Sequence, residues 1–153
     1  GRRHGLHASV TRMRALGRAE PELLRRQASS ARVDARAIGA SRPGRSLGRV
    51  FEEIRQQYSA EGFPEEWRLH HQGGLTGYAG REIFAVPGEP HVLAANQVVA
   101  WNPSITGAKS EDTALVTEGG PEVLTRTGTW PEITAESEEG AVARPAVLEG
   151  GTS

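Results

Sequence analysis

The 153-residue chain contains no cysteine and no apolar run close to the ~18 residues that a membrane-spanning helix requires. The absence of cysteine excludes disulfides, thiolate zinc sites and a thiol nucleophile. We therefore expect a soluble, cytoplasmic protein that does not enter a membrane. The chain starts at Gly1, within sequence that already has the pattern of a folded domain, and we expect a fragment of a longer protein.

Lysine is nearly absent, since Lys109 is the single lysine among 18 basic residues. Residues 1–60 carry 13 Arg against five acidic residues, whereas residues 61–153 carry five basic residues against 14 acidic ones. The N-terminal Arg residues lie among Glu and Ala at solvent-facing helical positions, without interleaved aromatic residues. This pattern is typical of solvated helix faces, and we expect no nucleic-acid partner.

Two segments have helical periodicity. Pro21 suits a first helical turn, and apolar residues then recur at spacings of four and three up to Gly39, at Leu24, Ala28, Ala31, Ala35 and Ile38. After the turn at residues 42–44, Ser46 is a candidate N-cap, and Gly62 a candidate stop for a second amphipathic helix. We expect the two helices to pack side by side on an apolar surface.

Several shorter runs have the pattern of strands. Apolar and polar residues roughly alternate over residues 4–15, which predicts one half-buried strand. Residues 98–101, 114–117 and 122–125 predict antiparallel strands, and the Glu118-Gly119-Gly120 link predicts a hairpin between the last two. Residues 135–153 are rich in Glu, Ala and Gly without stable periodicity, which predicts a disordered C-terminal tail.

Adjacent histidines, His70 and His71, precede Gln72-Gly73-Gly74. In an extended chain their side chains point to opposite faces, so that only one of them faces a site. The glycines that follow allow another chain to approach closely because they lack a Cβ. Taken alone, such a pair is more often a hydrogen-bonded or surface pair than a functional one.

Five short pieces follow one another in order: Thr11-Arg12, His71-Gln72-Gly73-Gly74, Arg81-Glu82, Trp101-Asn102-Pro103, and residues 109–113 running into Leu115-Val116-Thr117. The series resembles the pita-bread family of methionine aminopeptidase, Xaa-Pro aminopeptidase and dipeptidase, and creatinase. There the pieces are Asp-x-Thr-Arg, His-Gly-x-Gly, His-Glu, Glu-Pro-Gly and Glu-Asp-Thr. The resemblance implies an α+β fold, a curved antiparallel sheet backed by helices, with residues 1–134 as part of the domain.

The resemblance also assigns metal-ligand positions. His71 falls on the metal-binding His of the family, and Glu111 falls on its last metal-bridging Glu. Ser9 and Asn102 stand where the family has metal-binding carboxylates. The first metal-binding Asp would precede Gly1.

Bridging carboxylates offset the charge of two nearby divalent ions. Ser9 and Asn102 remove two such negative charges, which makes a tight two-metal centre less favourable. The resemblance implies His71 and Glu111 as catalytic residues and ligands, with one divalent ion (Mn, Co or Zn) or none. Arg81, Glu82 and Asn102 are candidate substrate-binding residues, although Arg81-Glu82 is equally a surface ion pair. We expect His71, Asn102 and Glu111 to converge on the concave face of the sheet.

Three functions remain open at this stage. The first is an Xaa-Pro-peptidase-like hydrolase with a degraded two-metal site. The second is a metal-free, creatinase-like amide or C–N hydrolase, in which His71 shuttles a proton and Glu111 polarises the substrate. The third is a catalytically inactive module that binds a peptide or protein. The expected ligand is a small peptide or small molecule, and the full-length protein is expected to be a homodimer.

Overall fold

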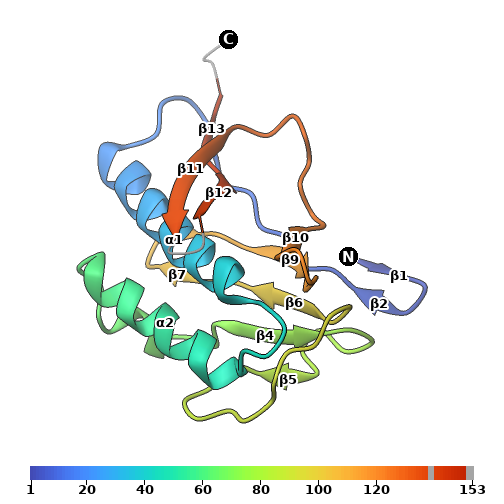
Figure 1. The fold of residues 1–153 in the computed structure, drawn as a ribbon. Coiled ribbons are helices and arrows are strands. Elements are labelled where there is room, and N and C mark those ends of the chain that lie inside the picture. The colour runs from blue at the N-terminus through green and yellow to red at the C-terminus, as the bar shows by residue number, and fades with distance from the viewer. Residues whose placement is uncertain (138–139, 151–153) are drawn as a thin grey trace.

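The computed structural model describes residues 1–137 and 140–150. Helices α1 (Pro21–Ala40) and α2 (Leu47–Ala60) lie side by side on one face of an antiparallel sheet (Figure 1). The sheet has five strands in the order β10-β9-β6-β4-β5. Their bounds are β4 (Gly73–Thr76), β5 (Ile83–Phe84), β6 (Val98–Trp101), β9 (Asp112–Leu115) and β10 (Glu122–Val123). The predicted fold class and both predicted helices are confirmed.

Local sequence accounts for the ends of the helices. Pro21 is the first residue of α1, where its missing N–H costs no hydrogen bond. The Ser46 hydroxyl caps α2 by accepting from the Arg49 backbone N–H at 3.3 Å. Gly62 follows α2 with a φ of +84°, a left-handed conformation that glycine adopts readily. The short helix η1 (Glu66–Arg68) then leads to the sheet.

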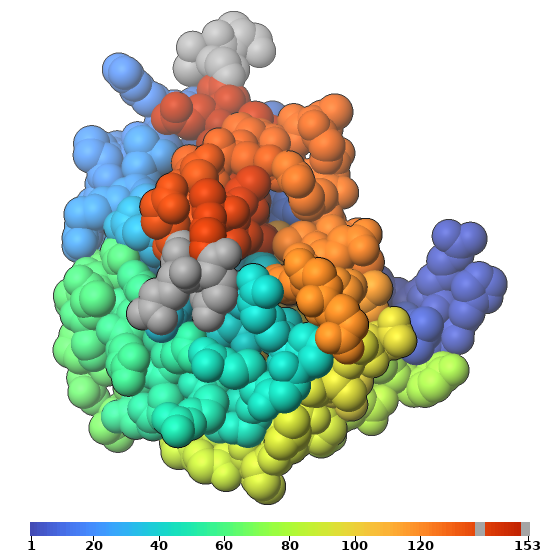
Figure 2. Space-filling view, viewed as in Figure 1, coloured from blue at the N-terminus to red at the C-terminus, as the bar shows by residue number. Residues whose placement is uncertain are grey.

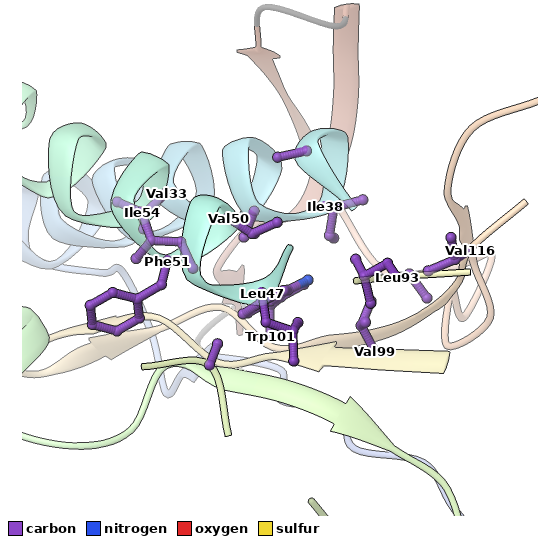
Figure 3. Close-up of a cluster of buried hydrophobic side chains, with 14 of the residues drawn as sticks. Val33, Ile38, Leu47, Val50, Phe51, Ile54, Leu93, Val99, Trp101 and Val116 are labelled. Atoms are coloured by element: carbon purple, nitrogen blue, oxygen red, sulfur yellow. The ribbon is translucent and has the colours of Figure 1, made fainter. Parts of the chain in front are cut away.

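The core lies between the helices and the sheet (Figure 3). Side chains of both helices meet those of β6 and the loops beside it, chiefly Val33, Ile38, Leu47, Val50, Phe51, Ile54, Leu93, Val99, Trp101 and Val116. Trp101 is completely buried and its indole N–H donates to the Ser41 hydroxyl at 2.9 Å. This apolar layer fixes which face of each strand points toward the helices.

The other face of the sheet, which we call the open face, follows from strand alternation. Val99 and Trp101 point into the core, so Ala100 between them points to the open face. In the strand register Ala100 pairs with Thr113 on β9 and with Gly74 on β4. Gly74 in turn pairs with Phe84. The open face therefore carries Thr113, Phe84 and the small residues between them.

The prediction of one strand over residues 4–15 is wrong. The chain instead turns at His4 and Gly5, where φ is +51° and +86°, and forms a hairpin of β1 (Arg2–Arg3) and β2 (Leu6–His7). Thr11 then makes an isolated bridge to Glu111, and β3 (Arg14–Ala15) follows. Gly5 reverses the chain inside a run whose alternation is otherwise that of a strand.

The strands after residue 110 follow the prediction with shifted bounds. Strands β9 and β10 pair as the predicted hairpin, but β9 begins at Asp112 instead of residue 114. The apolar pattern does not reveal this start, because Asp112 is buried as one member of an ion-paired network. The short strands β7 (Ser104–Ile105) and β8 (Ala108–Lys109) form a small hairpin just before it.

The expectation of a disordered tail from residue 135 is also wrong for the described residues. Strands β11 (Glu132–Ser137) and β12 (Gly140–Pro145) form an antiparallel hairpin that packs on α1 (Figure 1). Figure 2 shows this segment covering α1 on one face of the molecule. Strand β13 (Leu148–Glu149) pairs with β3. A fully buried Arg144 holds this segment in place through ion pairs, and a hydropathy pattern does not predict that an arginine is buried. Residues 138–139 and 151–153 lie outside the described residues.

Gly74 provides a test of the close packing in the sheet. Its φ is +143°, and a Cβ placed there would lie 2.1 Å from the Ile83 carbonyl oxygen. Gly74→Ala is expected to destabilise the fold by roughly 1–3 kcal/mol through backbone strain, with a further cost from the clash. Urea unfolding measures this, with Gly107→Ala as the control, since Gly107 has positive φ but open space around it. Equal losses for both variants would show that the clash is relieved.

Candidate functional site

Among the described residues, Glu111 is the carboxylate at the centre of the candidate site. It directly precedes β9 and is half-buried. Its Oε2 accepts a hydrogen bond from the Thr11 hydroxyl at 2.5 Å and lies 3.3 Å from Lys109 Nζ. Its Oε1 lies 3.8 Å from a terminal nitrogen of Arg81. One negative charge therefore lies between two positive charges.

Arg81 reaches into the centre from the segment just before β5. Its side chain is 8% exposed. One terminal nitrogen lies 2.6 Å from the Gly80 carbonyl oxygen and 3.4 Å from Ser9 Oγ, and the other lies 3.4 Å from Asn102 Oδ1. Burial lowers the pKa of Arg81 and Glu111 opposes that shift, and a guanidinium with so high a starting pKa remains charged.

Ser9 is held beside the sheet by Thr113 of β9. The Ser9 backbone N–H donates to Thr113 Oγ1 at 2.8 Å, and the same hydroxyl donates to the Ser9 carbonyl oxygen at 2.9 Å. Asn102, at the end of β6, is 6% exposed. The N-terminal segment and two strands thus bring Ser9, Asn102 and Glu111 around one guanidinium.

His71 and His70 make different contacts. The His71 ring packs edge-on against Phe84 of the open face, with centroids 4.9 Å apart. The His70 Nδ1 lies 2.6 Å from the His71 carbonyl oxygen, beside Gln72, whose amide oxygen accepts from the Tyr58 hydroxyl of α2. Burial lowers the pKa of His71, and the positive charges of Arg81, His70 and Lys109 lower it further. The lowered pKa favours the neutral imidazole.

The structure brings the expected site residues together only in part. Asn102 and Glu111 contact the same Arg81 guanidinium. His71 instead contacts Phe84; the charges of the centre influence its pKa, but it makes no hydrogen bond to the described side chains of the centre. Glu82 is exposed and accepts from the Ala79 backbone N–H at 2.9 Å. It therefore closes the turn at residues 77–80.

The described side chains around Glu111 do not include the set of carboxylates that a two-metal centre uses. Among the described residues, no three His, Cys, Asp or Glu side chains come together as metal ligands. Ser9 and Asn102, at positions where the resemblance places carboxylates, offer neutral oxygens, and both face Arg81. A fixed guanidinium beside these oxygens repels a divalent cation and competes for its donors.

A buried chain of ion pairs supports the site strand from behind. Asp112 Oδ1 accepts from Arg12 at 2.9 Å, and Asp112 Oδ2 pairs with Arg144 of β12. Arg144 Nε lies 3.1 Å from Asp34 Oδ2 on α1. Sequence reasoning missed Arg144 and Asp34. The one available signal was an acidic residue on the predicted apolar stripe of α1, since Asp34 lies four residues before Ile38.

Asp34 should make stability depend on pH. Burial raises the pKa of Asp34 from 3.8 to about 6, helped by Asp112 and Glu111 and opposed by Arg144 and Ser110. Because the folded state holds this proton more tightly than the unfolded state, the stability it contributes is complete below pH 3.8 and is lost as pH rises through about 6.

The variant Asp34→Asn tests this dependence, because asparagine has a similar shape but no group that titrates. As the pH rises from 4 to 7, the free energy of unfolding of the wild-type protein should fall by on the order of 2–3 kcal/mol relative to that of the variant. Urea unfolding of both proteins at each pH measures this difference, in which the other titrating groups cancel. Parallel stability profiles would contradict the raised pKa of Asp34.

A cavity of about 660 Å³ lies between the N-terminal hairpin and the sheet. Its lining is mostly apolar and includes Leu6, Val98, Leu124 and Thr113. Thr113 connects the cavity to the charged centre, because its hydroxyl bonds to Ser9. An apolar space and a charged centre therefore adjoin on one face of the molecule.

Residues 1–118 match metallopeptidase family M24. The chain belongs to metallopeptidase family M24. The resemblance noted in the sequence is thereby confirmed, and members of this family typically depend on divalent metals. The match ends before β11 and β12, so Arg144 lies outside the matched residues. A comparison with curated protein sequences found no significant match.

Solved structures confirm the pita-bread fold. The dipeptidase PepE from Mycobacterium ulcerans superposes with a TM-score of 0.71 at 22% identity, covering 92% of this chain and 36% of that one. The X-Pro aminopeptidase from Thermotoga maritima gives a TM-score of 0.74 at 18% identity, covering 95% of this chain and 38% of that one. The N-terminal domain of the FACT complex subunit SPT16 from Cicer arietinum (chickpea) gives 0.60 at 14% identity, covering 72% and 30%. The chain therefore spans well under half of each.

Proposed function

We propose that this M24 domain is a catalytically silent module that binds peptide segments without a metal. The observation that supports this is the position of Arg81. Its guanidinium faces Ser9, Asn102 and Glu111, the positions where the resemblance places metal-binding carboxylates. A two-metal hydrolase needs metal ions and several carboxylates at that place. Here the Arg81 guanidinium lies beside two neutral side chains, Ser9 and Asn102, and the carboxylate of Glu111.

The open face offers what a peptide ligand needs. The apolar cavity beside Leu6, Val98 and Leu124 can bury an apolar side chain, and the adjoining polar centre can orient the peptide backbone. The same fold also occurs in a subunit of the FACT complex, so the fold is found in an assembly as well as in peptidases.

One observation favours a second candidate, the metal-free hydrolase. Burial and positive neighbours lower the pKa of His71, which favours the neutral imidazole that can accept a proton. Against this role, His71 has no hydrogen bond to Glu111, which is held by Thr11 and Lys109.

Turnover measurements separate the two candidates. Xaa-Pro dipeptides and Leu-Pro-Leu should show no hydrolysis above the buffer rate, with or without added Mn²⁺. His71→Ala should leave the calorimetric affinity for Leu-Pro-Leu unchanged, as should the control His91→Ala, which lies outside the centre. A metal-free hydrolase would instead hydrolyse the substrate, and His71→Ala would lower its turnover rate roughly 10²–10⁴-fold. The absence of any Leu-Pro-Leu binding would count against the binding module.

A further inference from the structure

Among the described side chains, the centre of the site carries more positive than negative charge. Arg81 and Lys109 both lie within 4 Å of Glu111, whose carboxylate offsets one of them. Ser9 and Asn102 contribute no charge. A place that serves divalent cations in a metallopeptidase thus has a net positive charge in this chain.

The Arg81 guanidinium is also incompletely bonded. Of its contacts, the one to the Gly80 carbonyl is short at 2.6 Å, and those to Ser9, Asn102 and Glu111 are long at 3.4, 3.4 and 3.8 Å. Within the described chain, its Nε is buried and has no hydrogen-bond partner. A guanidinium offers five N–H donors in a fork that fits a planar or tetrahedral oxyanion. Arg81 therefore retains capacity for a further acceptor.

We propose that this centre binds an oxyanion, a carboxylate or phosphate group, between Arg81 and Lys109. The Lys109 side chain is 35% exposed and forms the solvent side of the centre, whereas Arg81 forms its floor. An entering oxyanion replaces the long Arg81–Glu111 contact with short charge-assisted hydrogen bonds. The inference deepens the proposed binding function and rests on it, because it names the chemical class of ligand that the site recognises.

The test follows the NMR signal of the Arg81 side-chain Nε–H in the wild-type protein. Sodium acetate and inorganic phosphate are titrated separately at constant ionic strength, with chloride as the balancing salt. Both should shift the signal saturably, and Lys109→Met should weaken each affinity about 10-fold or more. Arg25→Met, at an exposed helical position, is the matched control and should leave both affinities unchanged.

The outcomes distinguish a carboxylate ligand from a phosphate ligand, and failure of the oxyanion site from failure of the proposed peptide binding. Tighter acetate binding identifies carboxylates, such as a peptide C-terminus, as the ligand, and tighter phosphate binding identifies phosphorylated groups. A signal that no anion shifts saturably, or affinities equal in Lys109→Met and wild type, would overturn the inference. If Leu-Pro-Leu and its C-terminal amide bind equally well, the binding function stands and the oxyanion site fails. If the anions bind but no peptide does, the oxyanion site stands and the proposed peptide-binding function fails.

Discussion

Replacing Arg144 with methionine is expected to destabilise the protein by about 3–5 kcal/mol. Arg144 is completely buried and pairs with both Asp112 and Asp34, which are themselves buried. The methionine side chain fills similar space without charge, so it leaves Asp34 as an unpaired buried carboxylate. Urea unfolding at pH 7 measures the loss.

The double variant Arg144→Met/Asp34→Leu should recover much of that stability, because replacing a buried ion pair by apolar residues is often neutral. Asp112 keeps Arg12 as its partner in this background. The cost of Arg144→Met should also shrink below pH 6, where Asp34 can take up a proton. If Arg144→Met is no more damaging than Arg126→Met, at an exposed position, the buried network does not support the fold.

Restoring carboxylates should convert the centre into a metal site. The triple variant Ser9→Asp, Arg81→Met, Asn102→Glu removes the guanidinium and adds two anionic ligands beside Glu111. Its affinity for Mn²⁺ or Zn²⁺ should exceed that of the wild-type protein by roughly 100-fold or more, since ligand charge and number dominate affinity. Isothermal titration calorimetry with each ion measures the change.

The control for this conversion is Arg81→Met alone. It removes the repulsion but adds no ligand, so its metal affinity should stay close to that of the wild-type protein. If Arg81→Met alone bound metal as tightly as the triple variant, existing oxygens would be sufficient ligands and the importance of Ser9 and Asn102 would be refuted. If the triple variant bound no metal, the geometric correspondence with the family would fail.

Much of the fold could be predicted from local sequence. The helices were predictable because Pro21, Ser46 and Gly62 mark their ends and apolar residues mark their faces. The hairpin around Gly119 was predictable from its turn residues. These features depend on neighbours within a few positions, which periodicity detects.

The failures concern contacts between distant residues. The strand predicted through Gly5 was interrupted by a turn, and the expected tail was ordered by Arg144 through partners more than 30 positions away. At the site, the replaced carboxylates at Ser9 and Asn102 could be read from the resemblance. That Arg81 would contact both of them depends on tertiary packing, which no local pattern encodes.

The most direct test of the account is the metal content of the purified protein after exhaustive dialysis, measured by elemental analysis. Because Arg81 faces Ser9, Asn102 and Glu111, we expect far less than one Mn, Co or Zn ion per chain, and no loss of thermal stability on adding a chelator. Two tightly held ions per chain, with stability that falls on chelation, would show that other ligands complete a metal centre and would contradict the account.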